Sequence, residues 1–142
     1  MNDLDELEMH ISASRQGLSH CRRRVARAAA RLGFKDEELM GIVSAVSEAC
    51  INALTHGCPN GKSAPVLYLH THPNRFEAVV QDSGQGFTCP ANTPMPSISS
   101  RRGRGIPLMK HFMDEIKIES RNGCRVTLVK YVHPRRRAGN RF

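Results

Sequence analysis

The chain has 142 residues and a mass of 15.8 kDa, which is typical of one domain because two separate cores would each be unusually small. Apolar residues make up 39% and charged residues 24%, which excludes an intrinsically disordered chain. No apolar run reaches the roughly 18 residues that a bilayer-spanning helix needs, and the acidic beginning is unlike a signal peptide. We therefore expect neither a membrane-spanning nor a secreted protein.

The cysteines favour a reducing compartment. Their number is odd, they are scattered, and no two form a C-x-x-C pair, so neither a disulfide framework nor a zinc ribbon is indicated. They are Cys21, Cys50, Cys58, Cys89 and Cys124. The sequence thus predicts a cytoplasmic protein, with Cys50 on the buried side of its helix as part of the core.

The net charge of +8 is concentrated in two places. One is the end of the chain, where basic residues and no acids occur between 130 and 142. The other is a predicted early helix that contains Arg22, Arg23, Arg24, Arg27 and Arg31. We favour a solvated helix face and a basic tail, with nucleic acid or an acidic protein surface as the alternative. Aromatic residues are only 5% and leave little to stack on bases, which makes nucleic acid the weaker choice.

Hydrophobic periodicity predicts the elements of the first half. Residues 10–14 read as a short strand. Apolar side chains then recur at three- and four-residue steps over 18–32, which predicts an amphipathic helix ended by Gly33. Asp36 is the predicted N-cap of a second helix that runs to His56.

Shorter elements follow. Strands are predicted over 66–71, 76–81, 115–120 and 125–131, with a short helix over 106–113. The stretch 82–105 is rich in Gly, Pro, Ser and Asn and has no periodic pattern, as is common for lids over binding sites.

The order β-α-α-β-β-α-β-β predicts a two-layer α/β sandwich with helices on one face of a mostly antiparallel, mixed sheet. We expect a single domain over 1–133, followed by a basic, disordered tail over 134–142.

The second helix carries a polar pair on a face of small or neutral residues. Glu48 and Asn52 are four residues apart, so they project together, whereas Gly41 and Ala45 share their side. No Lys or Arg occurs between Glu38 and Lys62, although a solvated helix face would often carry them. A ligand that approaches closely fits this pattern, and an ordinary wet face is the alternative.

Two glycine-rich turns follow in the sequence. Asp82 stands directly after a predicted strand and is followed by Gly84 and Gly86, which let a flat ligand come near while the carboxylate accepts from an exocyclic amine. Ordinary turn chemistry is the alternative. The second turn comprises Arg102, Gly103, Arg104 and Gly105 and leads into the short helix. Free N–H groups at a helix start, with flanking arginines, form an anion cradle, and a hinge with solvated arginines is the alternative.

Together these motifs resemble the GHKL ATPase superfamily, whose Bergerat fold binds ATP under a mobile lid. The run from Glu48 to Gly57 is similar to its N box, the run from Asp82 to Phe87 to its first glycine box, and Gly103-Arg104-Gly105 to its second. The stretches 105–115 and 125–130 are similar to one branch, the anti-sigma-factor serine kinases of the RsbW and SpoIIAB type. The resemblance spans about residues 10–131.

This resemblance implies roles for single residues. Glu48 would be the general base on an attacking serine hydroxyl, and Asn52 would bind Mg²⁺ and the nucleotide phosphates. Asp82 would accept from the adenine amine. Phosphoryl transfer depends mainly on positioning and charge neutralisation, so one carboxylate with one metal suffices.

The resemblance also assigns the turn residues. Gly84 and Gly86 would let the purine pack closely, and the amides near Gly103 and Gly105 would hold the phosphates. Arg102 and Arg104 are the candidates for neutralising phosphate charge.

One position departs from the family pattern. Gly123 is followed by Cys124 where the family usually has Thr, whose hydroxyl supports the adenine-binding Asp. A thiol is a poor hydrogen-bond donor, so reduced nucleotide affinity is expected, with Thr127 as a partial substitute. Two other sets, the pair His70 and His72 and the motif His56-x-Cys58, lack a second pair at zinc spacing and do not indicate a metal site.

The resemblance implies an anti-sigma factor with ATP-dependent protein-serine kinase activity. It would sequester an alternative sigma factor and phosphorylate a serine of a STAS-type anti-anti-sigma partner, using ATP and Mg²⁺, and would form a homodimer. The alternative is a non-catalytic, nucleotide-dependent binding module that acts on another regulator or on nucleic acid.

Overall fold

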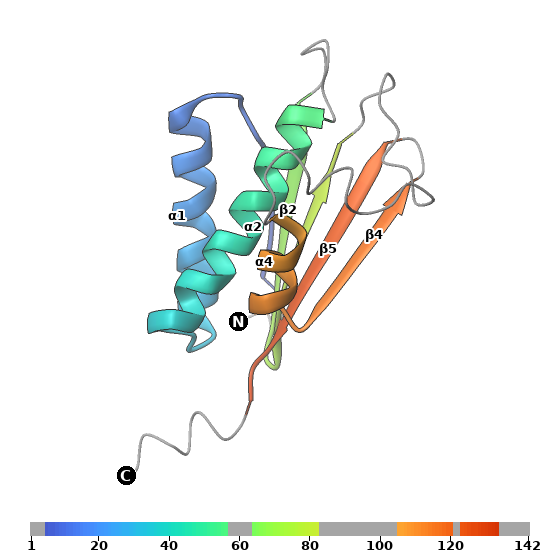
Figure 1. Cartoon of the computed structure of the whole chain (residues 1–142). Coiled ribbons are helices and arrows are strands. Elements are labelled where there is room, and N and C mark those ends of the chain that lie inside the picture. Colours follow the sequence, from blue (N-terminus) through green and yellow to red (C-terminus); the bar gives the residue numbers. More distant parts are fainter. Residues whose placement is uncertain (1–4, 57–63, 83–104, 121–122, 134–142) are drawn as a thin grey trace.

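Helices cover one face of a five-stranded sheet in this protein (Figure 1). A computed structural model describes residues 5–56, 64–82, 105–120 and 123–133. The predicted basic tail and most of the predicted lid therefore lie outside the described residues. Within them, the predicted two-layer α/β sandwich is confirmed.

The helices lie close to their predicted bounds. They are α1 (Arg15–Arg31), α2 (Asp36–His56) and α4 (Gly105–Phe112). Ser14 caps α1, because its Oγ accepts a hydrogen bond of 2.9 Å from the Gly17 N–H. Asp36 belongs to the first turn of α2 with Glu37 and Glu38. Acidic side chains stabilise a helix at this end, because they interact with the positive end of its dipole.

The strands β2 (Val66–His72), β3 (Arg75–Gln81), β4 (Glu115–Ser120) and β5 (Cys124–Tyr131) match the prediction within one residue. The first strand was misplaced, since β1 is Asp5–His10 and not 10–14. In β1 the apolar Leu7 and Met9 pack against the core and alternate with acidic residues on the other face, and this short alternation was missed. Ile11 then leaves the strand and is fully buried.

The strand order is β1-β2-β3-β5-β4, and every neighbouring pair is antiparallel. The strand β5 lies between β3 and β4, so the connection that contains α4 passes over one strand. The sheet was expected to be mixed, and no neighbouring pair among the described strands is parallel. This order places the end of β3 beside the start of β5, because Gln81 is paired with Arg125.

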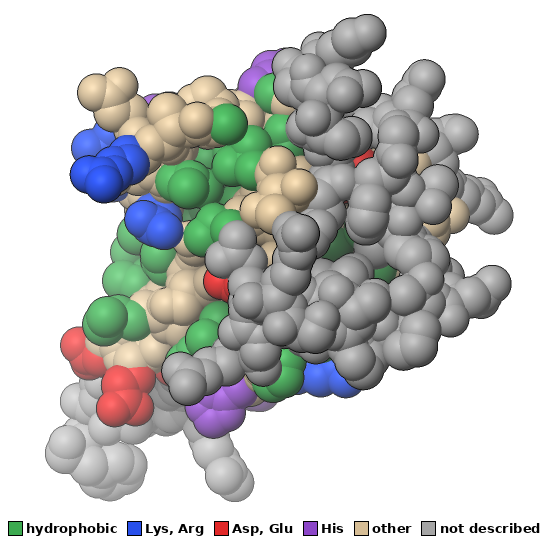
Figure 2. Space-filling view, turned by 45° about the horizontal axis from the view of Figure 1, so that its top comes forward, with side chains coloured by type: hydrophobic (Ala, Val, Ile, Leu, Met, Phe, Trp, Pro, Cys, Tyr) green, Lys and Arg blue, Asp and Glu red, His purple; other side chains and the backbone are tan. Residues whose placement is uncertain are grey.

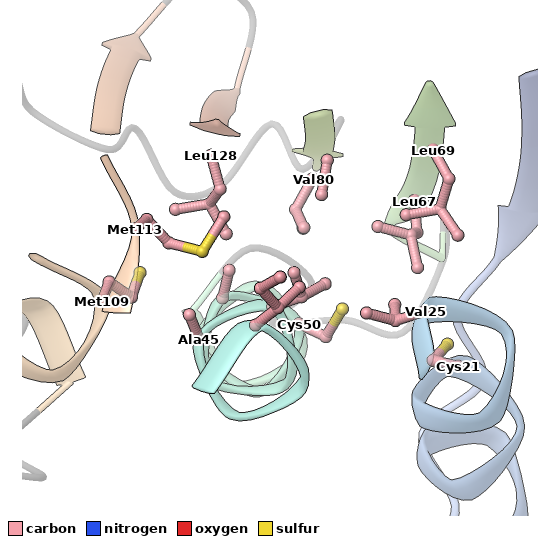
Figure 3. Packing of buried hydrophobic residues seen from close by; sticks show 14 of the residues in the cluster. Cys21, Val25, Ala45, Cys50, Leu67, Leu69, Val80, Met109, Met113 and Leu128 are labelled. Atoms are coloured by element: carbon pink, nitrogen blue, oxygen red, sulfur yellow. The ribbon is translucent and has the colours of Figure 1, made fainter. Parts of the chain in front are cut away.

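Helix α2 forms the centre of the core (Figure 3). It packs against α1, α4 and the sheet, and Ile42, Val46 and Cys50 are almost completely buried. The prediction that Cys50 is a core residue is confirmed. By length and composition α2 is also the one described helix that could cross a membrane, over Asp36–Thr55 with a mean hydropathy of 1.2. Its apolar character serves the core, because the sheet and two helices cover it.

The prediction that the small residues of α2 lie on an open face is wrong. Gly41 and Ala45 were expected on an open face, but both are buried because α4 packs against this side of the helix. Gly41 lies so close to the Phe112 ring that a Cβ at this position would collide with it. Gly41 and Ala45 are therefore not available to a ligand.

We predict that Ile42→Ala lowers the free energy of unfolding by about 2–5 kcal/mol, because it leaves a cavity in a fully buried site. Met40 lies on the same helix with 71% of its surface exposed, so Met40→Ala should change this free energy by no more than about 0.5 kcal/mol. Urea denaturation of both variants measures the difference, and equal losses would contradict the placement of α2.

Candidate functional site

Glu48 and Asn52 meet the first residue of α4. A Cβ placed on Gly105 would lie 3.2 Å from Glu48 Oε1 and 3.5 Å from Asn52 Nδ2. Any larger residue would therefore occupy the space in front of both side chains. The structure thus brings together three predicted site residues that are far apart in the sequence, at the point where α4 begins.

Asn52 has an orphaned polar atom. Its Oδ1 is buried and accepts no hydrogen bond from any residue that the structure describes. Such an oxygen is costly in a folded protein unless a ligand satisfies it. Because Mg²⁺ prefers oxygen ligands and binds through few protein groups plus phosphates, the buried amide oxygen of Asn52 fits a magnesium–phosphate group.

Asp82 lies at the end of β3 and is 3% exposed. Its N–H donates to the Cys124 carbonyl at 2.9 Å, and its Oδ1 accepts from the Cys124 N–H at 3.2 Å. A buried carboxylate needs such donors. These two bonds extend the β3–β5 pairing by one residue and fix the orientation of the carboxylate.

Gly123 allows this arrangement. Its φ of 111° is one that side chains disfavour, and a Cβ here would collide with the Asp82 carbonyl oxygen and lie 2.9 Å from Asp82 Oδ1. The sequence places Gly123 in a turn, and the family resemblance places it next to the position whose Thr supports the adenine-binding Asp. Only the structure shows how closely Gly123 packs on Asp82.

In the family a Thr hydroxyl supports the adenine-binding Asp. Here the main chain supports the Oδ1 atom of Asp82. The N–H of Cys124 makes the contact, and a main-chain donor is independent of the side chain. Thr127 does not take this part. It alternates with Val126 and Leu128, which pack with the core, so Thr127 faces the open side of the sheet. Asp82 continues the alternation of Ala78 and Val80 on the helix-covered side.

The other predicted site residues lie outside the described residues, and the structure does not test them. They are Gly84, Gly86, Arg102, Gly103 and Arg104. The described part of the site therefore consists of Glu48, Asn52 and Gly105 on one side and the Asp82–Cys124 junction on the other.

The histidines of β2 lie elsewhere. His70 Nδ1 is 3.6 Å from Glu6 Oε1, beside a hollow of about 510 Å³ on the open face of the sheet. Partial burial and the charge of Arg75 lower the pKa of His72. Among the described residues, no three His, Cys, Asp or Glu side chains are grouped so that they could hold a metal ion.

Comparison with known proteins agrees with the geometry. The model of the histidine kinase-like ATPase domain matches residues 11–130. The chain is 29% identical over 145 residues to the serine-protein kinase RsbW of Bacillus subtilis, covering 95% of this chain and 91% of that protein. It is 33% identical over 138 residues to the anti-sigma F factor of Anoxybacillus flavithermus, covering 90% of this chain and 93% of that protein.

A solved structure has a similar fold. It contains the RsbU and RsbW domains of a Mycobacterium tuberculosis protein, with a TM-score of 0.66 and 21% sequence identity. The match covers 92% of this chain and 33% of the larger one.

We predict that Gly123→Ala destabilises the protein more than Gly33→Ala. Both glycines have positive φ values, but a Cβ on Gly33 would contact nothing within 4 Å. Gly33→Ala should therefore cost only backbone strain, about 1 kcal/mol. Gly123→Ala should cost about 3 kcal/mol, since Asp82 must also move. Urea denaturation measures both, and equal costs would disprove the close packing of Gly123 on Asp82.

Proposed function

Because the chain belongs to the family of histidine kinase-like ATPase domains, we propose that it is an ATP-dependent protein-serine kinase that acts as an anti-sigma factor. The observation that supports this best is the meeting of Glu48, Asn52 and Gly105 at a helix start, together with the buried Oδ1 of Asn52, which has no hydrogen-bond partner among the described residues. The relatives named as a serine-protein kinase and as anti-sigma F factors agree with both halves of the proposal.

Glu48 would accept the proton of the attacking serine hydroxyl. Its Oε1 lies 3.2 Å from the place that a Cβ on Gly105 would occupy. The resemblance implies that backbone amides near Gly105 hold the phosphates. Asn52 would bind the metal through Oδ1, and its Nδ2 is free to face the phosphate side. When bound, Mg²⁺ would neutralise charge on the phosphate oxygens during transfer.

The base of the nucleotide would lie against Asp82. The Cys124 N–H holds one carboxylate oxygen, which fixes the carboxylate as an acceptor for the exocyclic amine of adenine. Gly84 and Gly86 would border the purine, and Arg102, Gly103 and Arg104 would hold the phosphates together with Gly105. Thr127 is left out of this proposal because it lies on the opposite face of the sheet.

The partners proposed from the resemblance are a STAS-type anti-anti-sigma protein, as the serine substrate, and an alternative sigma factor. The active form would be a cytoplasmic homodimer. In such a module ATP allows phosphorylation of the antagonist, so the output depends on the ratio of ATP to ADP.

A non-catalytic binding module is the second candidate, favoured by the basic surface of α1. Figure 2 shows Lys and Arg side chains on the side of the molecule where α1 lies. Beside this helix is a hollow of about 250 Å³, lined by Arg24, Arg27 and Arg31. Such a module would bind an acidic partner and would have no need of a base at Glu48.

We predict that Glu48→Gln keeps the affinity for ATP but lowers the rate of phosphate transfer by about 10²–10⁴-fold, the usual contribution of a general base. Transfer from labelled ATP to a co-purified STAS protein measures the rate, and titration of a fluorescent ATP analogue measures affinity. The control is Glu37→Gln, in the exposed first turn of the same helix. Transfer at the wild-type rate in Glu48→Gln would favour the binding module.

Asn52→Ala removes the buried amide oxygen, so we predict that it loses the Mg²⁺-dependent part of nucleotide binding. Calorimetric titration with ADP, with and without Mg²⁺, should show at least about a tenfold metal effect in the wild type and little in the variant. Thr127→Ala serves as the control, since it lies on the other face and should behave as the wild type. An unchanged metal effect in Asn52→Ala would remove Asn52 from the metal site.

A further inference from the structure

The strand β1 forms one edge of the sheet. Among the described strands it is paired with β2 alone, and Ile11, the residue after the strand, donates its N–H to the Pro65 carbonyl at 2.8 Å. In an antiparallel pair, the backbone groups of successive residues point alternately toward and away from the neighbouring strand. Because Ile11 points toward β2, the N–H and C=O groups of Glu6, Glu8 and His10 point away from it, along the outer edge of β1.

This edge lacks the features that usually prevent another strand from pairing with it. The strand contains no Pro and no Lys from Asp5 to His10, and its residues are paired one to one with those of β2, without a bulge. Soluble proteins commonly protect edge strands with Pro, Lys or a bulge. The described part of β1 is therefore open to the addition of a further strand.

Arginines of α1 lie beside this edge, on the helix-covered side of the sheet. The hollow of about 250 Å³ beside α1 is lined by Arg24 and Arg27 and also by Leu7 of β1 and Leu69 of β2. Figure 3 shows α1 on the side of the sheet to which Leu69 projects, with β1 in dark blue at the outer side of β2. The side chains of Arg24 and Arg27 form no ion pair or hydrogen bond with another described residue, so their charges are available to a partner.

A strand added to β1 would meet opposite charges on its two faces. On the helix-covered side its side chains would lie next to Leu7, Arg24 and Arg27. On the open face they would lie next to Glu6 and Glu8. Opposite charges on the same face of neighbouring strands stabilise the pairing. The segment that fits has an acidic residue at every second position and basic residues between them.

We propose that the outer edge of β1 and the arginines of α1 form a docking surface for an extended segment of a partner protein, in which acidic side chains alternate with basic ones. The segment adds a strand to the sheet, so that main-chain hydrogen bonds supply affinity and the alternating side chains supply specificity. A second copy of this chain fits less well. In a continuous antiparallel sheet its β1 would bring Leu7 and Met9 to the arginines and leave their charges unmatched.

This docking surface is separate from the proposed nucleotide site. The strand β2 lies between β1 and β3, which leads to Asp82, and the arginines belong to α1 and not to α2. The test therefore needs no nucleotide, and its failure would leave the kinase proposal unaffected.

The probe is a synthetic peptide in which Glu and Lys alternate over about ten residues, enough for a strand of ordinary length. The control peptide has the same composition, with Glu in one half and Lys in the other, so that acidic and basic side chains no longer lie on opposite faces. Fluorescence anisotropy at low salt measures binding to the full-length protein. We expect the alternating peptide to bind at least about fivefold more tightly. Equal affinities, or no binding of either peptide, would overturn the proposal.

Glu8→Pro tests the contribution of the backbone. It removes an N–H that points away from β2, so the pairing of β1 with β2 is kept, and we expect the alternating peptide to bind about tenfold more weakly. Glu8→Gln keeps this N–H and should bind within about threefold of the wild type. Circular dichroism checks folding, and Glu6→Pro, whose N–H also points outward, replaces a Glu8→Pro variant that does not fold. Unchanged binding in the proline variant would contradict strand addition.

The double variant Arg24→Gln with Arg27→Gln tests the charges, and we expect it to bind the alternating peptide at least about fivefold more weakly. Its control, Arg15→Gln with Arg23→Gln, removes the same charge from exposed positions of α1 outside the hollow and should stay within about twofold of the wild type. Equal losses in both would mean binding by net charge alone and would overturn the proposal. Size-exclusion chromatography tests the other occupant: a wild-type dimer that Glu8→Pro separates would assign this edge to a second copy.

Discussion

The candidate site depends on the packing of α2 between its neighbours. One side of this helix is buried against α1 and the sheet, and α4 covers another side through Gly41, Ala45 and Phe112. With these contacts made, the polar pair Glu48 and Asn52 has one direction left, toward the start of α4. The apolar contacts of the helix thus determine where its carboxylate and amide point.

The second constraint is the pairing of β3 with β5. Because β5 lies next to β3, Asp82 reaches the Gly123–Cys124 turn and obtains a main-chain donor. The sheet order therefore fixes the side chain of Asp82 at the end of β3. Helix packing fixes the side chain of Asn52 near the end of α2 in the same way. Position 124 is Cys where the family usually has Thr, so the sequence indicates that a supporting hydroxyl is missing. The structure shows that the backbone still supports the carboxylate.

Most of the fold could be predicted from periodicity, because the helices and most strands carry regular apolar patterns. The exception, β1, is a short edge strand whose acidic residues hid a two-residue alternation. The chemistry at Glu48, Asn52 and Asp82 was also present in the sequence as residue types at particular spacings. What only the tertiary structure decided is which neighbours these residues have: Gly105 in front of Asn52, Gly123 beneath Asp82, α4 over Ala45, and Thr127 on the far face. Contacts of this kind join residues that are distant in the chain, and local propensity carries no information about them, because they arise when helices and strands pack into layers.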